Sequence, residues 1–323
     1  GSETAINRGE GMSQVPEIAV QGFAVVGALV VLRAAYSVLN FIYASFLRPG
    51  KNLKKLGSWA VVTGSTDGIG KELAKQLAKK GFNIVLVGRT PAKLTAAKQE
   101  VLEKAPGVEV REVKFDFAAA TKADYDRITK ELSSLEIGVL YNNVGVSYDH
   151  AEVLEDVDEE KIEALIEVNN RSMVKMTRIV LPGMVSRRKG AIVNIGSFAG
   201  STTDPFYSVY SGSKAFVEMF SRSMAVELKS KGVTVADHVP LFVATKMAIP
   251  NEKRRKGTMF TPWPAQWAAA SLNNVGYSSF SVPYWPHALQ AAFAQSLPDW
   301  LWNKLRFDMN AKIRKIALKK KQQ

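Results

Sequence analysis

The sequence predicts an α/β protein built on a doubly wound parallel sheet, with an apolar helix before the sheet and an amphipathic extension after it. Between Trp59 and Val239, short apolar runs alternate with helical patterns, and no linker interrupts them. A glycine-rich turn joins the first of these runs to the first helical pattern. Ahead of them, the long apolar segment Ile18–Leu47 carries a single charge, Arg33.

The segment Ile18–Leu47 is long enough to cross a membrane, since a span needs about 20 apolar residues. We expect one spanning helix, tilted or with Arg33 snorkelling to the surface. A hairpin, an in-plane anchor and a cleaved signal peptide are the alternatives. Residues 1–11 look like an expression remnant before a natural start at Met12.

Charges on the two sides of this segment predict its orientation. Basic residues follow it and acidic residues precede it, so the positive-inside rule places the rest of the chain in the cytosol. The basic residues are Arg48, Lys51, Lys54 and Lys55, and the acidic ones are Glu3, Glu10 and Glu17.

The glycine-rich turn follows an apolar run, Trp59–Thr63, that predicts a strand. Glycines let the backbone approach a pyrophosphate, which then rests at the positive end of the helix dipole. The spacing G-x-x-x-G-x-G differs from the commoner G-x-G-x-x-G, but the flanking strand and helix favour a nucleotide site. We expect cofactor contacts from the whole turn, namely Gly64, Ser65, Thr66, Asp67, Gly68, Ile69 and Gly70.

A second predicted strand, Asn83–Val87, ends beside a cation. An acidic residue here would hold the ribose of NAD, whereas an arginine suits the 2′-phosphate of NADP. No acid occurs in Gly88–Thr90, and Arg89 is followed by Lys93. These two residues therefore favour NADP(H).

Three side chains predict proton transfer to or from a carbonyl group. Tyr210 and Lys214 are four residues apart, so on a helix they lie on one face. A nearby ammonium can lower the pKa of a phenol, which is ordinarily near 10. Ser197 ends the apolar run GAIVNIGS, a predicted buried strand, where its hydroxyl could reach a substrate carbonyl.

Four motifs in order resemble the short-chain dehydrogenase/reductase family: TGSTDGIG, NNVG, the serine thirteen residues before YxxxK, and PLFVAT. The resemblance covers about Trp59 to Met247. It implies a Rossmann-type sheet with Tyr210 as general acid in the reducing direction. It also implies that Lys214 lowers the pKa of Tyr210 and binds the nicotinamide ribose, while Ser197 hydrogen-bonds the substrate carbonyl.

The resemblance implies further positions. An asparagine in the preceding helix completes a proton relay through water, and it matches Asn169, with Asn170 as the alternative. Pro240-Leu241 stands where the family has Pro-Gly, which leaves the backbone path of that loop open. The remaining implied cofactor contacts are the adenine pair Asp116 and Phe117, then Asn143, Gly145, Pro240, Val243 and the carboxamide contact Thr245.

The stretches GFNIVLVGRT, IGVLYNNVGVSY, TRIVLPGM and VPLFVATKM resemble one branch more closely, the membrane-bound very-long-chain 3-oxoacyl-CoA reductases, fungal type, grouped with the 17-beta-hydroxysteroid dehydrogenases. This implies reduction of a 3-oxoacyl-CoA during fatty-acid elongation at the endoplasmic reticulum, beside other elongation enzymes. A homodimer through the Tyr210 helix is also implied. A steroid, 3-ketosphinganine or retinoid reductase, or a non-catalytic scaffold, is the alternative.

The chain is strongly basic, with 43 Lys and Arg against 30 Asp and Glu and a net charge of +13. No nucleic-acid-reading motif accompanies the charge, so we expect no nucleic-acid partner. The basic clusters flank segments that could touch anionic lipid. The cluster Lys253, Arg254, Arg255 and Lys256 could instead receive coenzyme A phosphates. The absence of cysteine excludes disulfides and fits a cytosolic catalytic domain.

The aromatic-rich region 277–307 predicts an interfacial helix, the wall of an acyl tunnel, or ordinary core packing. The end Lys320-Lys321-Gln322-Gln323 resembles a dilysine retrieval signal. We assign no catalytic or metal role to His150, His238 or His287. The expected divisions are a remnant (1–11), an anchor with linker (12–56), a catalytic domain (57–250), a covering region (251–307) and a basic tail (308–323).

Overall fold

The computed structural model describes residues 17–321, and their contacts divide the chain into two compact units, residues 1–48 and 49–323. The proposed remnant 1–11, Met12, Glu3, Glu10 and the last two residues of the dilysine end lie outside the described residues. In the first unit, α1 (Glu17–Ile42) continues into a π turn (Tyr43–Leu47). Among the described residues, Ile18–Leu47 is the one helix long and apolar enough to cross a membrane, judged by length and composition.

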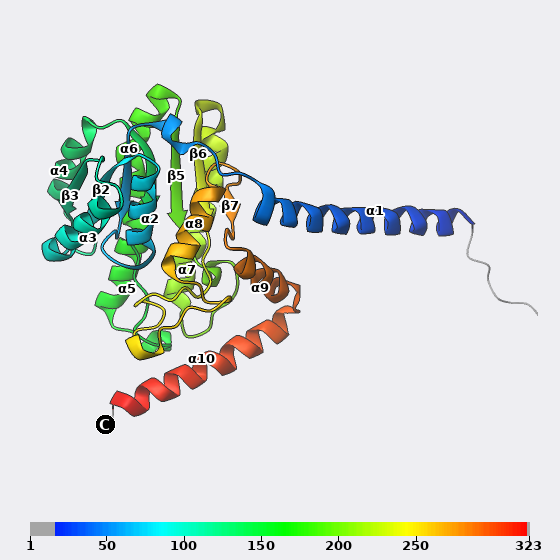
Figure 1. The fold of residues 1–323 in the computed structure, drawn as a ribbon. Helices are drawn as coiled ribbons and strands as arrows, with labels where there is room; N and C mark the ends of the chain where they lie inside the picture. The colour runs from blue at the N-terminus through cyan, green and yellow to red at the C-terminus, as the bar shows by residue number, and fades with distance from the viewer. Residues whose placement is uncertain (1–16, 322–323) are drawn as a thin grey trace, which may run out of the picture. The chain divides into compact units, whose positions relative to one another are not determined.

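The second unit is built on a seven-stranded parallel sheet with the order β3-β2-β1-β4-β5-β6-β7 (Figure 1). The strands are β1 (Trp59–Thr63), β2 (Asn83–Gly88), β3 (Val110–Lys114), β4 (Ile137–Asn142), β5 (Gly190–Ile195), β6 (Val233–His238) and β7 (Phe280–Ser281). The strand order reverses between β1 and β4, and such a switch point opens the crevice where parallel sheets bind nucleotides.

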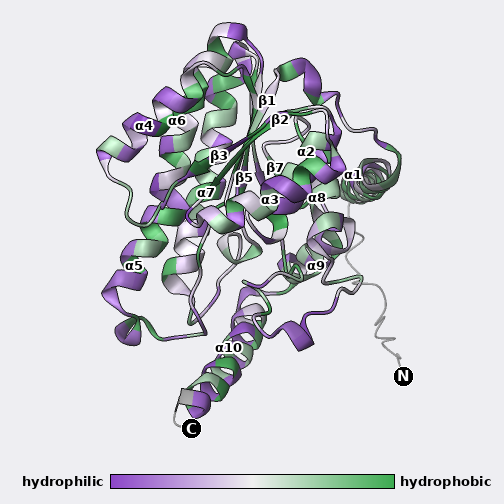
Figure 2. Ribbon diagram, turned by 60° about the vertical axis from the view of Figure 1, so that its left-hand side comes forward, coloured by the Kyte–Doolittle hydropathy of each residue, from purple (hydrophilic) through white to green (hydrophobic). Residues whose placement is uncertain are grey.

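Helices cover both faces of the sheet, which confirms the predicted doubly wound fold. Side chains of β1 alternate between the two layers: Val62 belongs to the same buried cluster as Leu73 of α2, and Val61 belongs to the same buried cluster as Ile128 of α4. Figure 2 shows the strands as hydrophobic and most helices as mixed, because each helix buries only one face. The helices of these layers are α2 (Gly68–Lys79), α3 (Pro91–Lys104), α4 (Lys122–Ser133), α5 (Glu159–Ile166), α6 (Ser172–Arg187), α7 (Ser208–Leu228) and α8 (Pro264–Asn274).

Short turns complete the unit. A π turn joins α5 to α6 at Glu167–Arg171. The 3-10 turns are Leu53–Leu56, Leu154–Asp156, Phe198–Gly200, Lys229–Lys231 and Glu252–Arg254.

The chain ends in two helices, α9 (Trp285–Ser296) and α10 (Asp299–Lys321), and α10 crosses the end of the sheet at which the strands terminate (Figure 1). One side of α10 is hydrogen-bonded to the loops there, for example through Trp302 Nε1 to the Thr203 carbonyl at 3.1 Å. Away from these contacts it exposes large apolar side chains such as Trp300 and Ile316. Core packing therefore accounts for only part of the aromatic-rich region.

Candidate active site

The glycine turn between β1 and α2 has a backbone that only glycine adopts easily. Gly64 and Gly68 have φ values of 64° and 54°. A Cβ added to Gly64 would lie 2.9 Å from Val144 Cα, and one added to Gly70 would lie 2.3 Å from the Gly64 carbonyl. Asp67 caps α2 by accepting a hydrogen bond from the Gly68 amide at 2.7 Å. The result is a tight cradle at the N-terminus of a helix, which fits a pyrophosphate.

Other residues of the turn support it from within. The Ser65 side chain is fully buried, and its hydroxyl donates to the Val87 carbonyl at 3.4 Å. Ile69 is partly buried and packs against the core. Only the backbone of these two residues is therefore placed to meet a ligand, whereas Thr66 lies against Gly88 at the end of β2.

Asn143 holds the turn from the neighbouring strand. Its Nδ2 donates to the carbonyls of Thr63 and Gly64, at 3.0 and 3.1 Å. Thr63 Oγ1 in turn accepts from the amides of Asn143 and Val144, at 3.0 Å each. The sequence missed Thr63, since a threonine that ends an apolar run carries no distinguishing local signal. Asn143 thus contributes to cofactor binding by holding the glycine turn in shape, because both hydrogen bonds of its side-chain amide go to that turn.

Arg89 and Lys93 lie exposed at the end of β2 and in the first turn of α3. A Cβ added to Gly88, next to Arg89, would lie 3.0 Å from Thr66 Cγ2 of the glycine turn. Arg89 therefore lies next to a residue that contacts the glycine turn, and Lys93 is four residues further along the chain. Both could bind the 2′-phosphate of a cofactor held in that turn.

The predicted adenine pair follows β3. Asp116 is exposed, and its Oδ1 accepts from the Ala118 amide at 3.1 Å. The Phe117 ring is buried and packs on Phe115, with 4.6 Å between the ring centroids. Phe117 therefore has its backbone, and not its ring, available for a cofactor.

Ser197 and Tyr210 meet at the ends of β5 and α7. Ser197 caps the turn Phe198–Gly200 by accepting from the Ala199 amide at 3.3 Å. Burial raises the pKa of Tyr210, its hydrogen bond with the Ser197 hydroxyl lowers the pKa, and the charge of Asp204 raises it further. A phenol in this setting keeps its proton through neutral pH, as a general acid requires.

Lys214 is buried one turn further along α7. Its Nζ donates to the Ile195 carbonyl at 2.9 Å and lies 6.0 Å from the centroid of the Tyr210 ring. Burial lowers the pKa of Lys214 to about 8, and Asp237 opposes this shift. We expected Lys214 to lower the pKa of Tyr210, but the groups that shift that pKa here are Ser197 and Asp204. The ammonium points at the Ile195 carbonyl instead of at the phenol oxygen.

The asparagine relay position lies in the π turn Glu167–Arg171, and such turns recur at functional sites. Asn169 accepts from the Val146 amide at 2.8 Å and donates to the Ser213 hydroxyl at 3.0 Å. A Cβ added to Gly145 would lie 3.3 Å from Asn169 Oδ1 and 3.6 Å from Lys214 Nζ. Asn170 instead donates to the Ser213 carbonyl at 2.7 Å. Gly145 thus keeps the space between Asn169 and Lys214 clear, which favours Asn169 for the relay.

The loop after β6 closes the site. The Pro240 carbonyl accepts from the Phe198 amide at 3.2 Å, beside Ser197. Thr245 lies against the glycine turn, since a Cβ on Gly68 would be 3.3 Å from Thr245 Cγ2. Val243 between them is buried in the core.

His287 supports the loop at Leu241 and Phe242. The Leu241 amide donates to His287 Nδ1 at 3.2 Å, and His287 Nε2 lies 3.2 Å from the Phe242 carbonyl. Burial lowers the pKa of His287 to about 4, so the ring is neutral and serves both contacts at neutral pH. His287 is therefore a support of the loop, a role that the sequence did not indicate.

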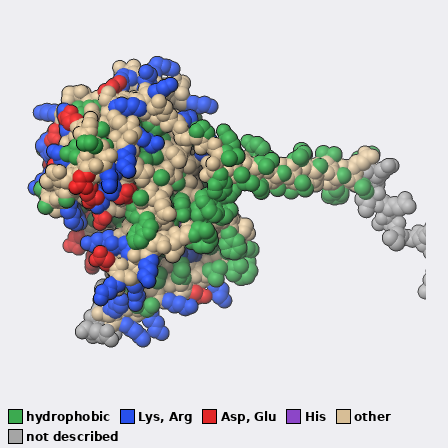
Figure 3. Space-filling view, in the orientation of Figure 1, with side chains coloured by type: hydrophobic (Ala, Val, Ile, Leu, Met, Phe, Trp, Pro, Cys, Tyr) green, Lys and Arg blue, Asp and Glu red, His purple; other side chains and the backbone are tan. Residues whose placement is uncertain are grey.

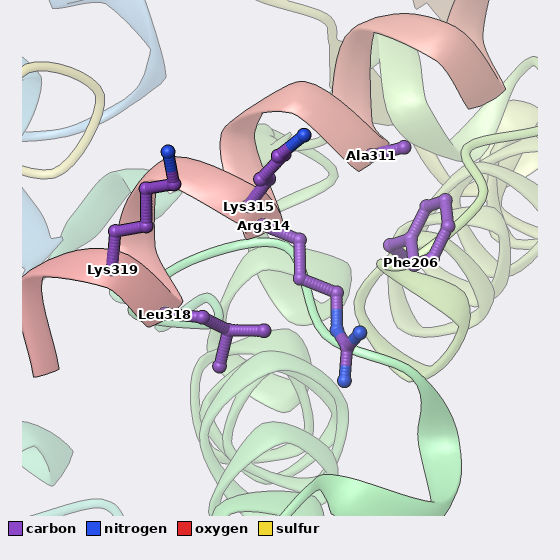
Figure 4. A pocket seen from close by; sticks show the side chains of 6 residues that line it. All are labelled: Phe206, Ala311, Arg314, Lys315, Leu318 and Lys319. Carbon is purple, nitrogen blue, oxygen red and sulfur yellow. The ribbon is translucent and has the colours of Figure 1, made fainter. Parts of the chain in front are cut away.

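A pocket of about 320 Å³ opens between α10 and the segment that leads to Tyr210 (Figure 4). Phe206 forms one wall, and its backbone is in the left-handed region with φ 67°. Arg314 is engaged by Glu152 and by Asp156, the latter at 2.6 Å. The described side chains that line the pocket are Phe206, Ala311, Arg314, Lys315, Leu318 and Lys319. Since Arg314 is paired with two carboxylates, the lining cations that could receive an anion are Lys315 and Lys319. In the described part of the chain, no cluster of three or more His, Cys, Asp or Glu side chains could hold a metal ion.

The chain is similar to known proteins over most of its length. Residues 58–256 match the family model described as short chain dehydrogenase. The chain is 44% identical to a human protein named very-long-chain 3-oxoacyl-CoA reductase, with 82% of this chain and 83% of the relative covered. It is 38% identical to a protein of the same name from Coprinopsis cinerea, with 91% and 89% covered.

A solved structure of a short-chain dehydrogenase from Sphingobium yanoikuyae in complex with NADPH is also similar. It is 28% identical, matches with a TM-score of 0.60, and covers 67% of this chain and 83% of its own.

Proposed function

Since the chain belongs to the short-chain dehydrogenase family, we propose that it reduces a very-long-chain 3-oxoacyl-CoA to the 3-hydroxyacyl-CoA with NADPH, as a step of fatty-acid elongation. The observation that carries the reductase activity is the meeting of Ser197, Tyr210 and Lys214 beside the glycine cradle. The substrate class rests on identity with the human and fungal relatives over most of the chain.

The residues divide the work of carbonyl reduction. The bound cofactor would supply the hydride that C3 of the substrate receives. Ser197 and Tyr210 would hold the ketone oxygen through their hydroxyl groups, and Tyr210 would donate the proton that this oxygen gains. Lys214 and Asn169 would return a proton to Tyr210 through water.

The cofactor preference follows from the end of β2. The glycine cradle fits the pyrophosphate, and Arg89 with Lys93 would bind the 2′-phosphate that distinguishes NADPH from NADH. Asp116 and the backbone of Phe117 would border the adenine, and Thr245 the carboxamide.

Two basic sites are candidates for the phosphates of coenzyme A. The first is the cluster 253–256, of which Arg255 is partly committed to the carbonyls of Ile249 and Pro250, at 3.1 and 3.3 Å. The second is the pocket with Lys315 and Lys319, which begins four residues before Tyr210. We favour the pocket, because the Phe206 ring and Leu318 can also cover apolar parts of the ligand (Figure 4).

The enzyme would work from the endoplasmic-reticulum membrane with its catalytic unit in the cytosol. The apolar helix α1 would cross the bilayer, and α9 with α10 would rest on its surface. Figure 3 shows hydrophobic side chains gathered over α9 and the beginning of α10. The exposed apolar side chains there are Leu289, Phe293, Trp300, Leu305, Phe307, Met309, Ile313 and Ile316. Lysines such as Lys304 and Lys312, which are exposed on the same helix, would meet anionic headgroups.

A second copy of the chain would bind along α7, beside other enzymes of elongation. This helix exposes Phe216, Met219 and Val226, which are large apolar side chains on a helix that also carries Tyr210. Light scattering of the purified protein, with Met219→Glu as the disrupting variant, would distinguish dimer from monomer.

The decisive experiment is NADPH oxidation by the detergent-solubilised full chain. A long-chain 3-oxoacyl-CoA, a ketosteroid and 3-ketosphinganine would be compared as substrates, and we expect the acyl-CoA to give the highest kcat/KM. Faster turnover of either other ketone would move the protein to another substrate class. Absence of turnover with all of them, while NADPH still binds, would favour a scaffold.

A further inference from the structure

Asp237 is a buried carboxyl group with no part in the mechanism above. It belongs to β6, where it pairs in register with Asn194 of β5 and Phe280 of β7, and its exposed fraction is 0%. No hydrogen bond of normal geometry reaches either carboxyl oxygen within the described residues, and the nearby Gly196 amide lowers the pKa of the carboxyl group only in part. Because an ionised carboxylate is costly to bury alone, a compensating charge is needed nearby.

That charge is Lys214. Its Nζ donates to the Ile195 carbonyl at 2.9 Å, and a Cβ on the next residue, Gly196, would lie 2.3 Å from Asp237 Oδ1. The ammonium and the carboxyl group thus both border the short segment Ile195–Gly196, directly before Ser197. A side chain at position 196 would fill the place of the carboxyl group, so the glycine makes room for it.

The electrostatics of the two groups are reciprocal. Burial lowers the pKa of Lys214 to about 8, and Asp237 raises it. Burial raises the pKa of Asp237 to about 7, and Lys214 lowers it. Asp237 is also the single carboxylate that influences Lys214 in the described part of the chain.

The other charged groups around Asp237 are already paired or turned away. Glu218 and Arg222 of α7 face it, but they bind each other at 2.7 Å. Glu218 also accepts from the Ser201 hydroxyl at 2.6 Å. His238, the next residue of β6, points its Nδ1 at the Ser271 hydroxyl at 2.8 Å, and burial lowers its pKa to about 3, which keeps it neutral.

We propose that Asp237 is a positioning residue of the catalytic centre, which acts through Lys214 because its carboxylate keeps the buried ammonium charged beside Tyr210. The proposal rests on the proposed function in one respect, namely that Tyr210 and Lys214 carry the proton transfer. Without the carboxylate, Lys214 loses its proton at a lower pH, because burial then acts unopposed. The alkaline limb of the activity profile therefore moves toward neutral pH.

The test is the pH profile of the full chain in detergent with Asp237→Asn, which keeps the shape and removes the charge. We expect the alkaline apparent pKa of kcat to fall by about one unit, which is a loss of about tenfold at high pH and little change near pH 6. Glu227→Gln is the matched control, since it removes an exposed carboxylate of the same helix, α7, that acts on neither Lys214 nor Asp237. Its alkaline limb should coincide with that of the wild type.

A second readout does not depend on turnover. NADPH binding, followed by the fluorescence of the bound nicotinamide, should lose affinity at a lower pH in Asp237→Asn than in the wild type, because Lys214 lies where the ribose would bind. Asp237→Ser repeats both measurements with a smaller side chain if Asp237→Asn is poorly folded. Unshifted alkaline limbs in both activity and binding would overturn the proposal, as would an equal loss at every pH. If the wild type binds NADPH but reduces no 3-oxoacyl-CoA, the proposed function is refuted. The pH dependence of NADPH binding then tests the role of Asp237 by itself.

Discussion

Tyr210 depends on its surroundings for the form in which it acts. Burial and Asp204 raise the pKa of the phenol, and its hydrogen bond with Ser197 only partly opposes them. The phenol therefore stays protonated at neutral pH, which favours reduction over oxidation. In the oxidising direction Tyr210 must first lose its proton, so oxidation should rise with pH.

At the residue scale, Tyr210→Phe should lower kcat by at least about 10²-fold, since it removes the general acid and leaves the fold. NADPH affinity should change little. Tyr207→Phe is the matched control, because Tyr207 is a partly buried neighbour whose pKa burial raises to about 12. Steady-state NADPH oxidation of both variants checks this, and full activity in Tyr210→Phe would remove the tyrosine from the mechanism.

Arg89 offers a test of the cofactor preference. Replacing Arg89 with Asp should weaken NADPH binding by about tenfold or more, because a charge-assisted contact to the 2′-phosphate becomes a repulsion. NADH, which lacks that phosphate, should bind equally well or better. Lys104→Asp makes the same charge change at the end of α3, away from the glycine turn, and should leave both affinities unchanged. An unaltered ratio of the two affinities in Arg89→Asp would show that the arginine does not read the phosphate.

At the scale of elements, α10 fastens the segment that leads to Tyr210. Asp204, which is buried, accepts from Arg306 Nε at 3.1 Å and from Asn310 Nδ2 at 2.8 Å. Asn310 also donates to the Pro205 carbonyl at 2.7 Å. These residues recur at helical spacing on one face of α10, so a single helix face holds the whole segment.

Arg306→Met should therefore destabilise the protein by about 3 kcal/mol, because it leaves the Asp204 carboxylate buried without its ion partner. The kcat should fall more than the NADPH affinity, since the loosened segment leads into Tyr210. Thermal unfolding and steady-state kinetics measure the two effects. Adding Asp204→Asn should recover part of the stability, and Lys312→Met, an exposed change on α10, should have no effect. If Arg306→Met unfolds at the wild-type temperature, the ion pair contributes no net stability.

Local patterns were sufficient for the elements that form the cradle. The run Trp59–Thr63 became β1 with the bounds predicted, and Ser197 follows β5, because apolar runs and glycines act on their immediate neighbours. The predicted strand Asn83–Val87 became β2 with one further residue, Gly88. The ion pair between Arg306 and Asp204 joins residues 102 positions apart, and no periodicity in the sequence indicates such a contact.

Two site features were hidden for a different reason. Asp237 looks like an ordinary polar residue near the end of a strand until the β5–β6 register brings it beside Gly196. The π turn that carries Asn169 also gives no clear signal in the helical pattern, because a single i→i+5 turn alters the apolar spacing at one place only. Sequence could name Asn169 and Asn170 as candidates, and the structure adds that Asn169 and Lys214 both border Gly145.

At the scale of the whole molecule, a substrate with a very long acyl chain poses a problem of delivery. Such a chain is soluble in the bilayer rather than in water, so the site should open close to a membrane surface. The apolar side chains left exposed on α9 and α10 suit that place, and α10 is also the helix that fastens the catalytic segment. Membrane contact and substrate entry would then involve the same helix.

The chain contains no cysteine, so a single introduced cysteine carries a dye at one known position. We expect a polarity-sensitive dye at Phe293→Cys, on the exposed face of α9, to shift to the blue in vesicles of the full chain and to be quenched by spin-labelled lipid. The reason is that Phe293, which is 68% exposed, would enter the headgroup region. The same dye at Lys130→Cys, on the exposed side of α4, should show neither effect. A blue shift without lipid quenching, reversed by dilution of the protein in the membrane, would mean that a second copy covers α9 instead. If the dye at position 293 emits like the dye at position 130, α9 does not touch the membrane. If neither labelled protein floats with the vesicles, α1 does not cross the bilayer.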